Sequence, residues 1–145
     1  MSRLIDRYRK QSAPVRDLST PGFGQVFFAL GLCRAALNLI GEHRSDSGRR
    51  SFDSFSNELE TFRNRAIYLT TPAGSEEAVG AAPVTRADVN DLAVRITHAA
   101  VALYKGTALL TDHPAQRLAR EAMFLLVWSC PGSVIDCTLD RLLEC

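Results

Sequence analysis

Residues 26–40 read VFFALGLCRAALNLI, and this stretch decides the class of fold. Its apolar residues recur at intervals of three and four, which is the spacing of one face of an α-helix. The members of this apolar stripe are Val26, Phe27, Leu30, Cys33, Leu37 and Ile40. The pattern predicts a long first helix that starts after Pro21–Gly22 and ends or is interrupted at Gly41 and the polar run HRSDSGRR.

The same spacing recurs twice in the middle of the chain. A second helix is expected from about Phe52 to Tyr68, and a third from Thr85 to near Gly106. The expected core positions of the second are Phe55, Leu59, Phe62, Ala66 and Leu69, and those of the third are Leu92, Ile96, Ala99 and Leu103. Between them, residues 70–84 read TTPAGSEEAVGAAPV, which predicts a linker or a mobile surface loop. Thr85-Arg86-Ala87-Asp88 then resembles a capping box.

Two further helices are expected toward the C-terminal end. Asp112-His113-Pro114 marks the start of one, because proline is favoured in a first helical turn. Its expected core face is Leu118, Ala122, Leu125 and Leu126. Cys130-Pro131-Gly132 breaks it, and a last helix follows with Val134, Cys137 and Leu142 facing inward. Because no alternating β pattern of useful length occurs, the fold class is expected to be an all-α, up-down bundle of four or five helices.

Length and composition fit one helical domain over residues 21–145, preceded by a basic arm over residues 1–20. The chain has 145 residues, of which 46% are hydrophobic, enough for one core. Its first sixteen residues carry five basic residues against one acid, and we expect the arm to be solvated, with contact to a phosphate or a partner as the alternative. A net charge of +1 gives no electrostatic indication of nucleic-acid binding. Stretches such as 123–128 are too short to span a membrane, and no signal peptide is apparent, so we expect a cytoplasmic protein.

Cysteine and histidine give no recognisable metal or redox motif. The four cysteines form no CxxC pair, and the three histidines are scattered. Cys33 and Cys137 are expected to act as small core residues, and Cys145 to be exposed. His98 is expected to be packed or half-exposed beside the core stripe. Cys130 follows a helix and invites interpretation as a nucleophile, although no base is brought near it in sequence.

Three segments carry a resemblance to a known family. Residues 105–122, KGTALLTDHPAQRLAREA, look like the acyl-CoA dehydrogenase segment GGYGYxxxYPVERLLRDA. Residues 31–37, GLCRAAL, resemble the GxxxAAL helix of that family, and residues 49–52, RRSF, resemble its R-x-x-F-G motif. Together they follow the family order from about Gly22 to Leu143, so the chain resembles the C-terminal helical domain of acyl-CoA dehydrogenases.

The resemblance implies a cofactor and a set of contacts. Family members bind FAD between a β-domain and this helical domain, usually in a tetramer. The implied flavin-binding residues here are Arg49, whose guanidinium suits a diphosphate, together with Phe52 and Gly106. The paired glycines of the family correspond to Lys105-Gly106. Because the β-domain and the N-terminal helical domain are not part of the resemblance, FAD is expected only in a complex, with a second copy or a companion subunit that carries them. An acyl thioester is the implied substrate.

The catalytic carboxylate of the family is missing. Its Tyr-Glu-Gly-Thr segment corresponds to residues 128–131, so Trp128 and Ser129 are the implied acyl-pocket residues and Ser129 replaces the glutamate. A serine hydroxyl is too weak a base to remove an α-proton unaided. The alternative position of the base, near Pro21, has no acid between Thr20 and Gly41. We therefore expect no catalytic residue and no metal site.

Three functions follow from these patterns. The first is an acyl-CoA dehydrogenase-like domain that is inactive alone and belongs to a flavoprotein. The second is a non-catalytic helical module for oligomerisation or protein interaction. The third is a thiol enzyme built on Cys130. An exposed apolar surface on the bundle favours a partner in the first two cases.

Overall fold

The computed structural model describes residues 23–143, which fold into five α-helices and two short 3₁₀ turns. Within these residues there is no strand, so the expected all-α fold is confirmed. The elements in chain order are α2 (Phe23–Glu42), α3 (Asp46–Leu69), η1 (Pro72–Gly74), α4 (Ser75–Tyr104), η2 (Lys105–Leu109), α5 (Pro114–Val127) and α6 (Gly132–Leu143). The basic arm over residues 1–20 and Cys145 lie outside the described residues.

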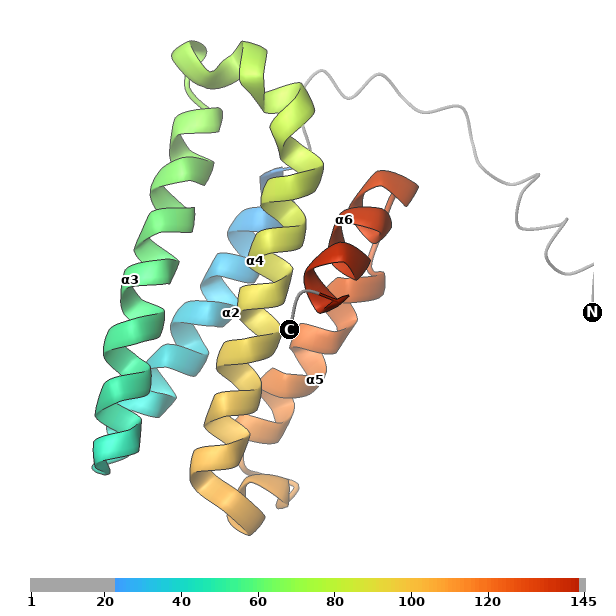
Figure 1. The fold of residues 1–145 in the computed structure, drawn as a ribbon. Coiled ribbons are helices and arrows are strands. Elements are labelled where there is room, and N and C mark those ends of the chain that lie inside the picture. The colour runs from blue at the N-terminus through green and yellow to red at the C-terminus, as the bar shows by residue number, and fades with distance from the viewer. Residues whose placement is uncertain (1–22, 144–145) are drawn as a thin grey trace, which may run out of the picture.

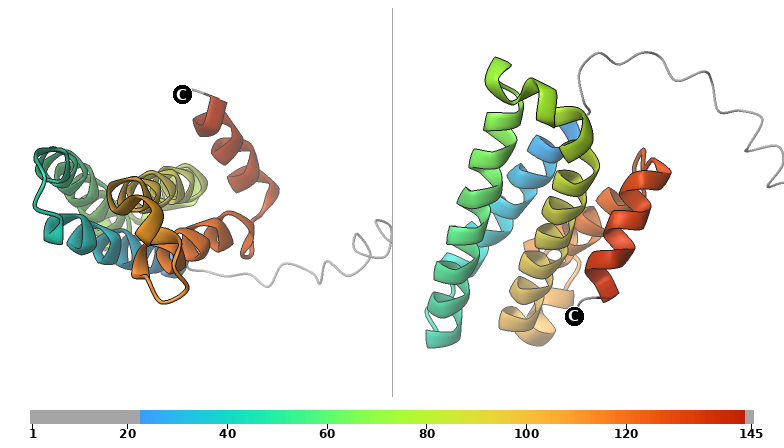
Figure 2. Two further views of the ribbon diagram at one scale, coloured as in Figure 1. Left: turned by 90° about the horizontal axis from the view of Figure 1, so that it is seen from below. Right: turned by 45° about the horizontal axis from the view of Figure 1, so that its top comes forward.

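Successive helices run in alternating directions, as expected for an up-down bundle (Figure 1). Seen from one end, α2 and α5 lie in one row and α3 and α4 in a second, while α6 lies on the outside of the bundle (Figure 2). Helix α4 is the central element, because it contacts all four other helices. One consequence is that α2 is covered by α3, α4 and α5 but has one side left open.

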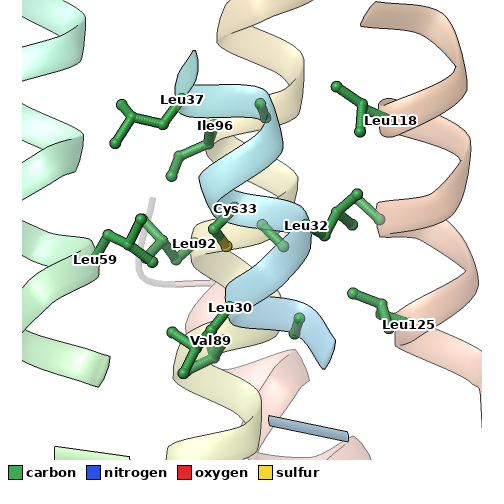
Figure 3. Close-up of a cluster of buried hydrophobic side chains, with 14 of the residues drawn as sticks. Leu30, Leu32, Cys33, Leu37, Leu59, Val89, Leu92, Ile96, Leu118 and Leu125 are labelled. Atoms are coloured by element: carbon green, nitrogen blue, oxygen red, sulfur yellow. The ribbon is translucent and has the colours of Figure 1, made fainter. Parts of the chain in front are cut away.

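The core forms where the apolar stripes of α2 and α4 meet those of α3 and α5. Leu37 and Cys33 of α2 are fully buried, as are Leu92 and Ile96 of α4. Figure 3 shows these side chains converging with Leu59 of α3 and Leu118 of α5. Each was expected to be a core residue from its spacing, because burial of one stripe is what holds an amphipathic helix in a bundle.

Helix α3 starts six residues earlier than expected. Its N-cap is Ser45, whose hydroxyl accepts a hydrogen bond from the backbone N–H of Gly48 at 3.0 Å. Asp46 follows in the first turn, where a negative charge interacts favourably with the positive end of the helix dipole. The polar run after Gly41 therefore contains a helix start as well as a break.

The expectation of a linker or loop over residues 70–84 was wrong. Only Thr70–Thr71 and η1 connect the helices, and α4 begins at Ser75 with Glu76 and Glu77 in its first turn. Alanines dominate this part of α4, and they have the highest helix propensity. Pro83 lies inside the helix, where it removes one hydrogen bond and bends the axis. In Figure 1 the first turns of α4 cross the top of the bundle before the helix turns downward.

The expected capping box at Thr85–Asp88 was therefore also wrong, since these residues lie in the interior of α4. Thr85 is buried, and its hydroxyl accepts a hydrogen bond from Nε of Arg65 at 3.5 Å. Asp88 pairs with Arg141 of α6 at 2.7 Å. Both side chains thus contact other helices, because no free helix N-terminus is present for them to cap.

Several expected core positions are less buried than their spacing indicated. Leu142 is 45% exposed, whereas Val134 and Thr138 form the buried face of α6. Helix α6 packs on α4 from outside, so only one narrow stripe is covered. Phe27 is 40% exposed, because it lies on the open side of α2. Four other expected core residues are half-buried and pack against the core: Phe55, Phe62, Ala99 and Leu103. Leu126 and Cys137 are also half-buried.

Helix α2 is also long and apolar enough, by length and composition, to cross a membrane. The sequence pattern had been interpreted without this possibility, because stretches such as residues 123–128 were taken as the longest apolar ones. In the bundle, 56% of the apolar window of α2 is buried. The core helix of a soluble protein has the same length and composition, so this feature does not decide between the two environments.

Candidate functional site

A network of polar contacts around one buried arginine lies at the turn after α5. This turn contains Trp128 and Ser129, the two residues expected to line an acyl pocket. Nη1 of Arg86 donates to the carbonyl oxygen of Ser129 at 2.9 Å, and Nη2 donates to the carbonyl oxygen of Trp128. Nη1 also donates to Oε1 of Gln25 at 2.6 Å. One side chain of α4 therefore joins the start of α2 to the end of α5.

Arg86 is only 6% exposed, and no carboxylate pairs with it among the described residues. Its Nε is buried and lacks a hydrogen-bond partner. The positive charge is instead compensated by the last carbonyl oxygens of α5, where the helix dipole is negative. Sequence analysis missed this role because it placed Arg86 at a helix start. The sequence does contain one signal: no acid lies three or four residues from Arg86, so Arg86 cannot form an ion pair of that spacing within its own helix.

Aromatic side chains gather beside the same turn. Trp128 lies edge-on to Phe28 of α2, with ring centroids 5.7 Å apart, and stacks on Phe124 of α5 at 5.7 Å. Phe28 is 58% exposed and Phe124 is 53% exposed. Val127 is exposed next to them. We call Phe28, Phe124, Val127 and Trp128 the aromatic end patch. These four side chains form an exposed apolar surface at the turn after α5.

The three residues implied as flavin contacts lie at the other end of the bundle. Arg49 is in the first turn of α3, and Gly106 follows α4. The ends of α2 and α4 meet there, since the rings of His43 and Tyr104 lie 5.2 Å apart. The aromatic end patch includes Phe28 of α2, which precedes His43 by fifteen residues. At 1.5 Å per residue this separates the two groups by roughly 20 Å.

Each of these three residues has a plain structural environment. Arg49 forms an ion pair with Asp46, and its side chain is 70% exposed. Phe52 is half-buried, with its ring against Gly41. A Cβ added to Gly106 would meet nothing within 4 Å, so packing does not require a glycine there. The guanidinium of Arg49 is therefore reachable from solvent, although its charge is already paired.

Backbone geometry singles out the residue before Gly106. Lys105 has φ 53° and ψ −138°, and Ser129 has φ 48°. These are the only non-glycine residues with positive φ among the described residues. Positive φ is uncommon for side chains with a Cβ and costs of order 1–3 kcal/mol in its rarer regions. Lys105 directly follows α4, whereas Ser129 lies two residues after the end of α5, at the opposite end of the bundle.

A cluster of rings closes the end that holds Lys105. Tyr104 lies between His43 and His113, and its hydroxyl donates to the carbonyl oxygen of Leu39 at 3.1 Å. Burial, and to a lesser extent the charge of Glu42, raises the pKa of Tyr104. His113 caps α5, because its Nδ1 accepts from the N–H of Ala115 at 3.2 Å. The expected helix start at His113–Pro114 is confirmed.

The remaining histidine and the thiols lie apart. His98 is exposed on α4. Cys33 is fully buried, and burial raises the pKa of its thiol to about 12. Cys130 is half-buried in the turn after Ser129, and the hydrogen bonds of His43, His98 and His113 within the described residues go to other groups. Among the described residues no group of three potential ligands can hold a metal ion.

No protein-family model, no curated protein and no solved structure matches the chain. What the structure defines is a class of fold, an all-α bundle with an exposed aromatic end patch beside a turn that Arg86 holds. The choice of a function rests on the geometry of these features.

Proposed function

We propose that this chain is an acyl-CoA dehydrogenase-like helical domain that works within a flavoprotein complex and does not catalyse dehydrogenation alone. FAD would be bound only in that complex, with Arg49, Phe52 and Gly106 as its contacts from this chain. An acyl thioester would be the ligand near Trp128 and Ser129. A companion chain, or further copies of this one, would complete the site.

The observation that carries this proposal is the backbone at Lys105 and Ser129. Lys105 has a conformation that favours glycine, and the resemblance implies the first of two glycines at this position. Ser129 has the other positive φ, at the position where the resemblance implies the catalytic glutamate. Strained backbone is concentrated at functional sites. The two unusual residues thus coincide with two motif positions.

The absence of activity in the isolated chain follows from the chemistry of the turn. The serine hydroxyl at position 129 is a far weaker base than the carboxylate it replaces. The aromatic end patch is exposed in the isolated chain, so a substrate bound there would remain open to water. A companion that covers this patch would exclude water and supply the missing parts of a flavin site.

The first experiment is purification of the full chain from its native cells under mild conditions, followed by visible absorbance and mass determination. We expect a complex that has the yellow colour of oxidised flavin, whereas the chain produced alone is expected to be colourless. A colourless native complex, or a native chain free of any partner and flavin, would contradict the proposal.

A second experiment restores the base. Ser129→Glu places a carboxylate at position 129, and Ser129→Gln is its matched control, because the amide has nearly the same size but cannot act as the base. In the flavin-containing complex of Ser129→Glu, an added acyl thioester is expected to bleach the flavin absorbance, and in that of Ser129→Gln it is expected not to. Because Arg49 and Gly106 lie roughly 20 Å from Ser129 of the same chain, the flavin beside Ser129 would be one held by a neighbouring chain. Flavin content measured beforehand separates loss of the cofactor from lack of a base.

The alternative function is a non-catalytic helical interaction module. It is favoured by the ion pair between Arg49 and Asp46, which leaves the implied phosphate contact already neutralised. It is also favoured by the open surface at Gly106, where nothing shapes a pocket. A native complex that contains a partner but no flavin would support this function over the first.

A further inference from the structure

Helix α5 is capped by a side chain whose charge changes near neutral pH. His113 is the N-cap, and Nδ1 of its ring accepts a hydrogen bond from the backbone N–H of Ala115 at 3.2 Å. Because Nδ1 accepts, the neutral ring carries its proton on Nε2. The usual N-cap residues, serine, threonine, aspartate and asparagine, do not gain a positive charge in acid. The cap of α5 is therefore available only while the imidazole is neutral.

Protonation of His113 opposes the start of α5 in two ways. The imidazolium ring has an N–H on both nitrogens, so Nδ1 can no longer accept from Ala115. The positive charge then lies at the N-terminus of a helix, where the helix dipole is also positive. Uptake of a proton thus removes from the folded chain a hydrogen bond that the unfolded chain never had. Stability consequently falls as the pH drops through the range in which histidine gains its charge.

The connection from η2 to α5 is held by the same helical turn. The N–H of His113 donates to the carbonyl oxygen of Leu110 at 2.9 Å. The side-chain amide of Gln116, in the first turn of α5, donates to the carbonyl oxygens of Leu110 and Thr111 at 3.0 and 2.9 Å. The ring of His113 also packs on that of Tyr104 of α4, with centroids 4.7 Å apart. Loss of the cap therefore loosens both the start of α5 and this connection.

The other two histidines keep their contacts when protonated. Nδ1 of His43 lies 2.9 Å from Oγ of Ser45, and that oxygen accepts from the N–H of Gly48 at the start of α3. A hydroxyl oxygen has two lone pairs, so a protonated His43 can donate to it while Gly48 does the same. Nδ1 of His98 lies 2.7 Å from the carbonyl oxygen of Val94, so it already donates. Only His113 must accept through its ring.

Charged groups on the neighbouring elements oppose one another at this cap. Glu42 of α2 and Asp112, directly before the cap, favour a protonated ring. Lys105 of η2 and Arg117 of α5 disfavour it. All four side chains are exposed, and no ion pair joins a carboxylate to His113 within the described residues. Water and salt screen exposed charges, so the lost cap is the larger effect.

We propose that His113 makes this end of the bundle sensitive to acid. The neutral ring caps α5 and holds the connection from η2, and the protonated ring releases both. Ala108 and Ala115, which are fully buried, become exposed to water when this end loosens. Lys105 lies at the start of the same connection, so release also relieves its positive φ. The strained and capped state is thus favoured near neutral pH, and the released state is favoured in acid.

The first test is urea denaturation of the full chain at about pH 7.5 and at about pH 5.5, on either side of the usual histidine titration. His113→Asn keeps an N-cap acceptor that does not titrate. His98→Asn is the matched control, because it makes the same change at a histidine that donates. Relative to His113→Asn, the unfolding equilibrium constant of the natural chain and of His98→Asn is expected to rise about fivefold on acidification. An equal change in all three proteins would overturn the proposal.

The second test observes the cap itself. In NMR spectra, the backbone amide resonance of Ala115 is expected to shift between these two pH values in the natural chain and to stay in place in His113→Asn. His113→Ala lacks an acceptor at every pH, so its unfolding equilibrium constant is expected to be about fivefold higher near neutral pH and to change little in acid. A His113→Ala variant as stable as the natural chain near neutral pH would contradict a cap at this position.

This inference does not depend on flavin, because both tests use the chain alone. Acid sensitivity in a chain whose native complex is colourless would keep it and overturn the proposed flavoprotein function. A yellow native complex of a chain that does not respond to acid would do the reverse.

Discussion

Nη1 of Arg86 lies 2.9 Å from the carbonyl oxygen of Ser129, forty-three residues later in the chain. A cation buried in the middle of α4 thus holds the end of α5, and through Gln25 it also holds the start of α2. Compensation by carbonyl oxygens and a helix dipole makes this burial of charge tolerable. The turn that contains Trp128 is fixed as a result.

Replacement of Arg86 is expected to loosen this turn. Arg86→Met keeps most of the apolar volume but removes three charge-assisted hydrogen bonds, and we expect a loss of about 2 kcal/mol in the free energy of unfolding. Arg86→Lys is expected to lose less, because an ammonium retains the charge but reaches fewer oxygens. Urea denaturation gives both values.

Fluorescence provides a local check on the same variants. The chain has one tryptophan, Trp128, which lies in the turn that Arg86 holds. Its emission is expected to shift to the red in Arg86→Met as the indole becomes more hydrated. A variant as stable as the natural chain, with unchanged emission, would contradict a role of Arg86 in positioning this turn.

Relief of backbone strain at Lys105 is expected to stabilise the bundle. Lys105→Gly removes the Cβ at φ 53°, and we expect a gain of about 1 kcal/mol after the larger entropy of an unfolded glycine is subtracted. Lys105→Ala keeps a Cβ, so it serves as the control and is expected to leave stability nearly unchanged. Thermal unfolding of the natural chain and the two variants measures these differences in stability. A Lys105→Gly variant less stable than the natural chain would argue against backbone strain at this position.

The two glycines near the start of α4 are expected to respond in opposite ways to the same substitution. A Cβ at Gly74 would overlap the carbonyl oxygen of Tyr68, so Gly74→Ala is expected to destabilise by about 1–3 kcal/mol. Gly80 has open space around it, and Gly80→Ala is expected to stabilise by about 0.5–1 kcal/mol. Chemical denaturation measures both, and effects of the same sign would contradict this packing.

Burial of Cys33 predicts a loss of stability at high pH. The pKa of its thiol is raised to about 12 in the folded chain from 9.0, chiefly by burial. Above pH 9 the unfolded thiol ionises while the folded one stays neutral, so stability is complete below pH 9 and falls as the pH rises. The slope approaches about 1.4 kcal/mol per pH unit between the two pKa values.

Cys33→Ala isolates this effect, because the other three cysteines remain in both proteins. Urea denaturation at a series of alkaline pH values is expected to show the natural chain losing stability faster than the variant. Parallel curves would mean that Cys33 is hydrated in the folded state.

The sequence by itself determined the class of fold and most of the core. Spacing of apolar residues predicted the buried faces of α2 and α5, and His113–Pro114 predicted the start of α5, because these signals act within a few residues of one another. The aromatic and small residues on the open side of α2 are equally visible in the sequence. Their exposure is not, because it depends on which neighbours cover the helix.

Only the tertiary structure decided where α4 begins and what Arg86 does. Glycine and proline between Thr70 and Val84 indicated a loop, but packing of Ala78 against the core outweighs their low helix propensity. Arg86 contacts partners on α2 and beyond α5 that are more than forty residues away. Local pattern carries no information on such pairs, since they arise only when separate helices are brought together.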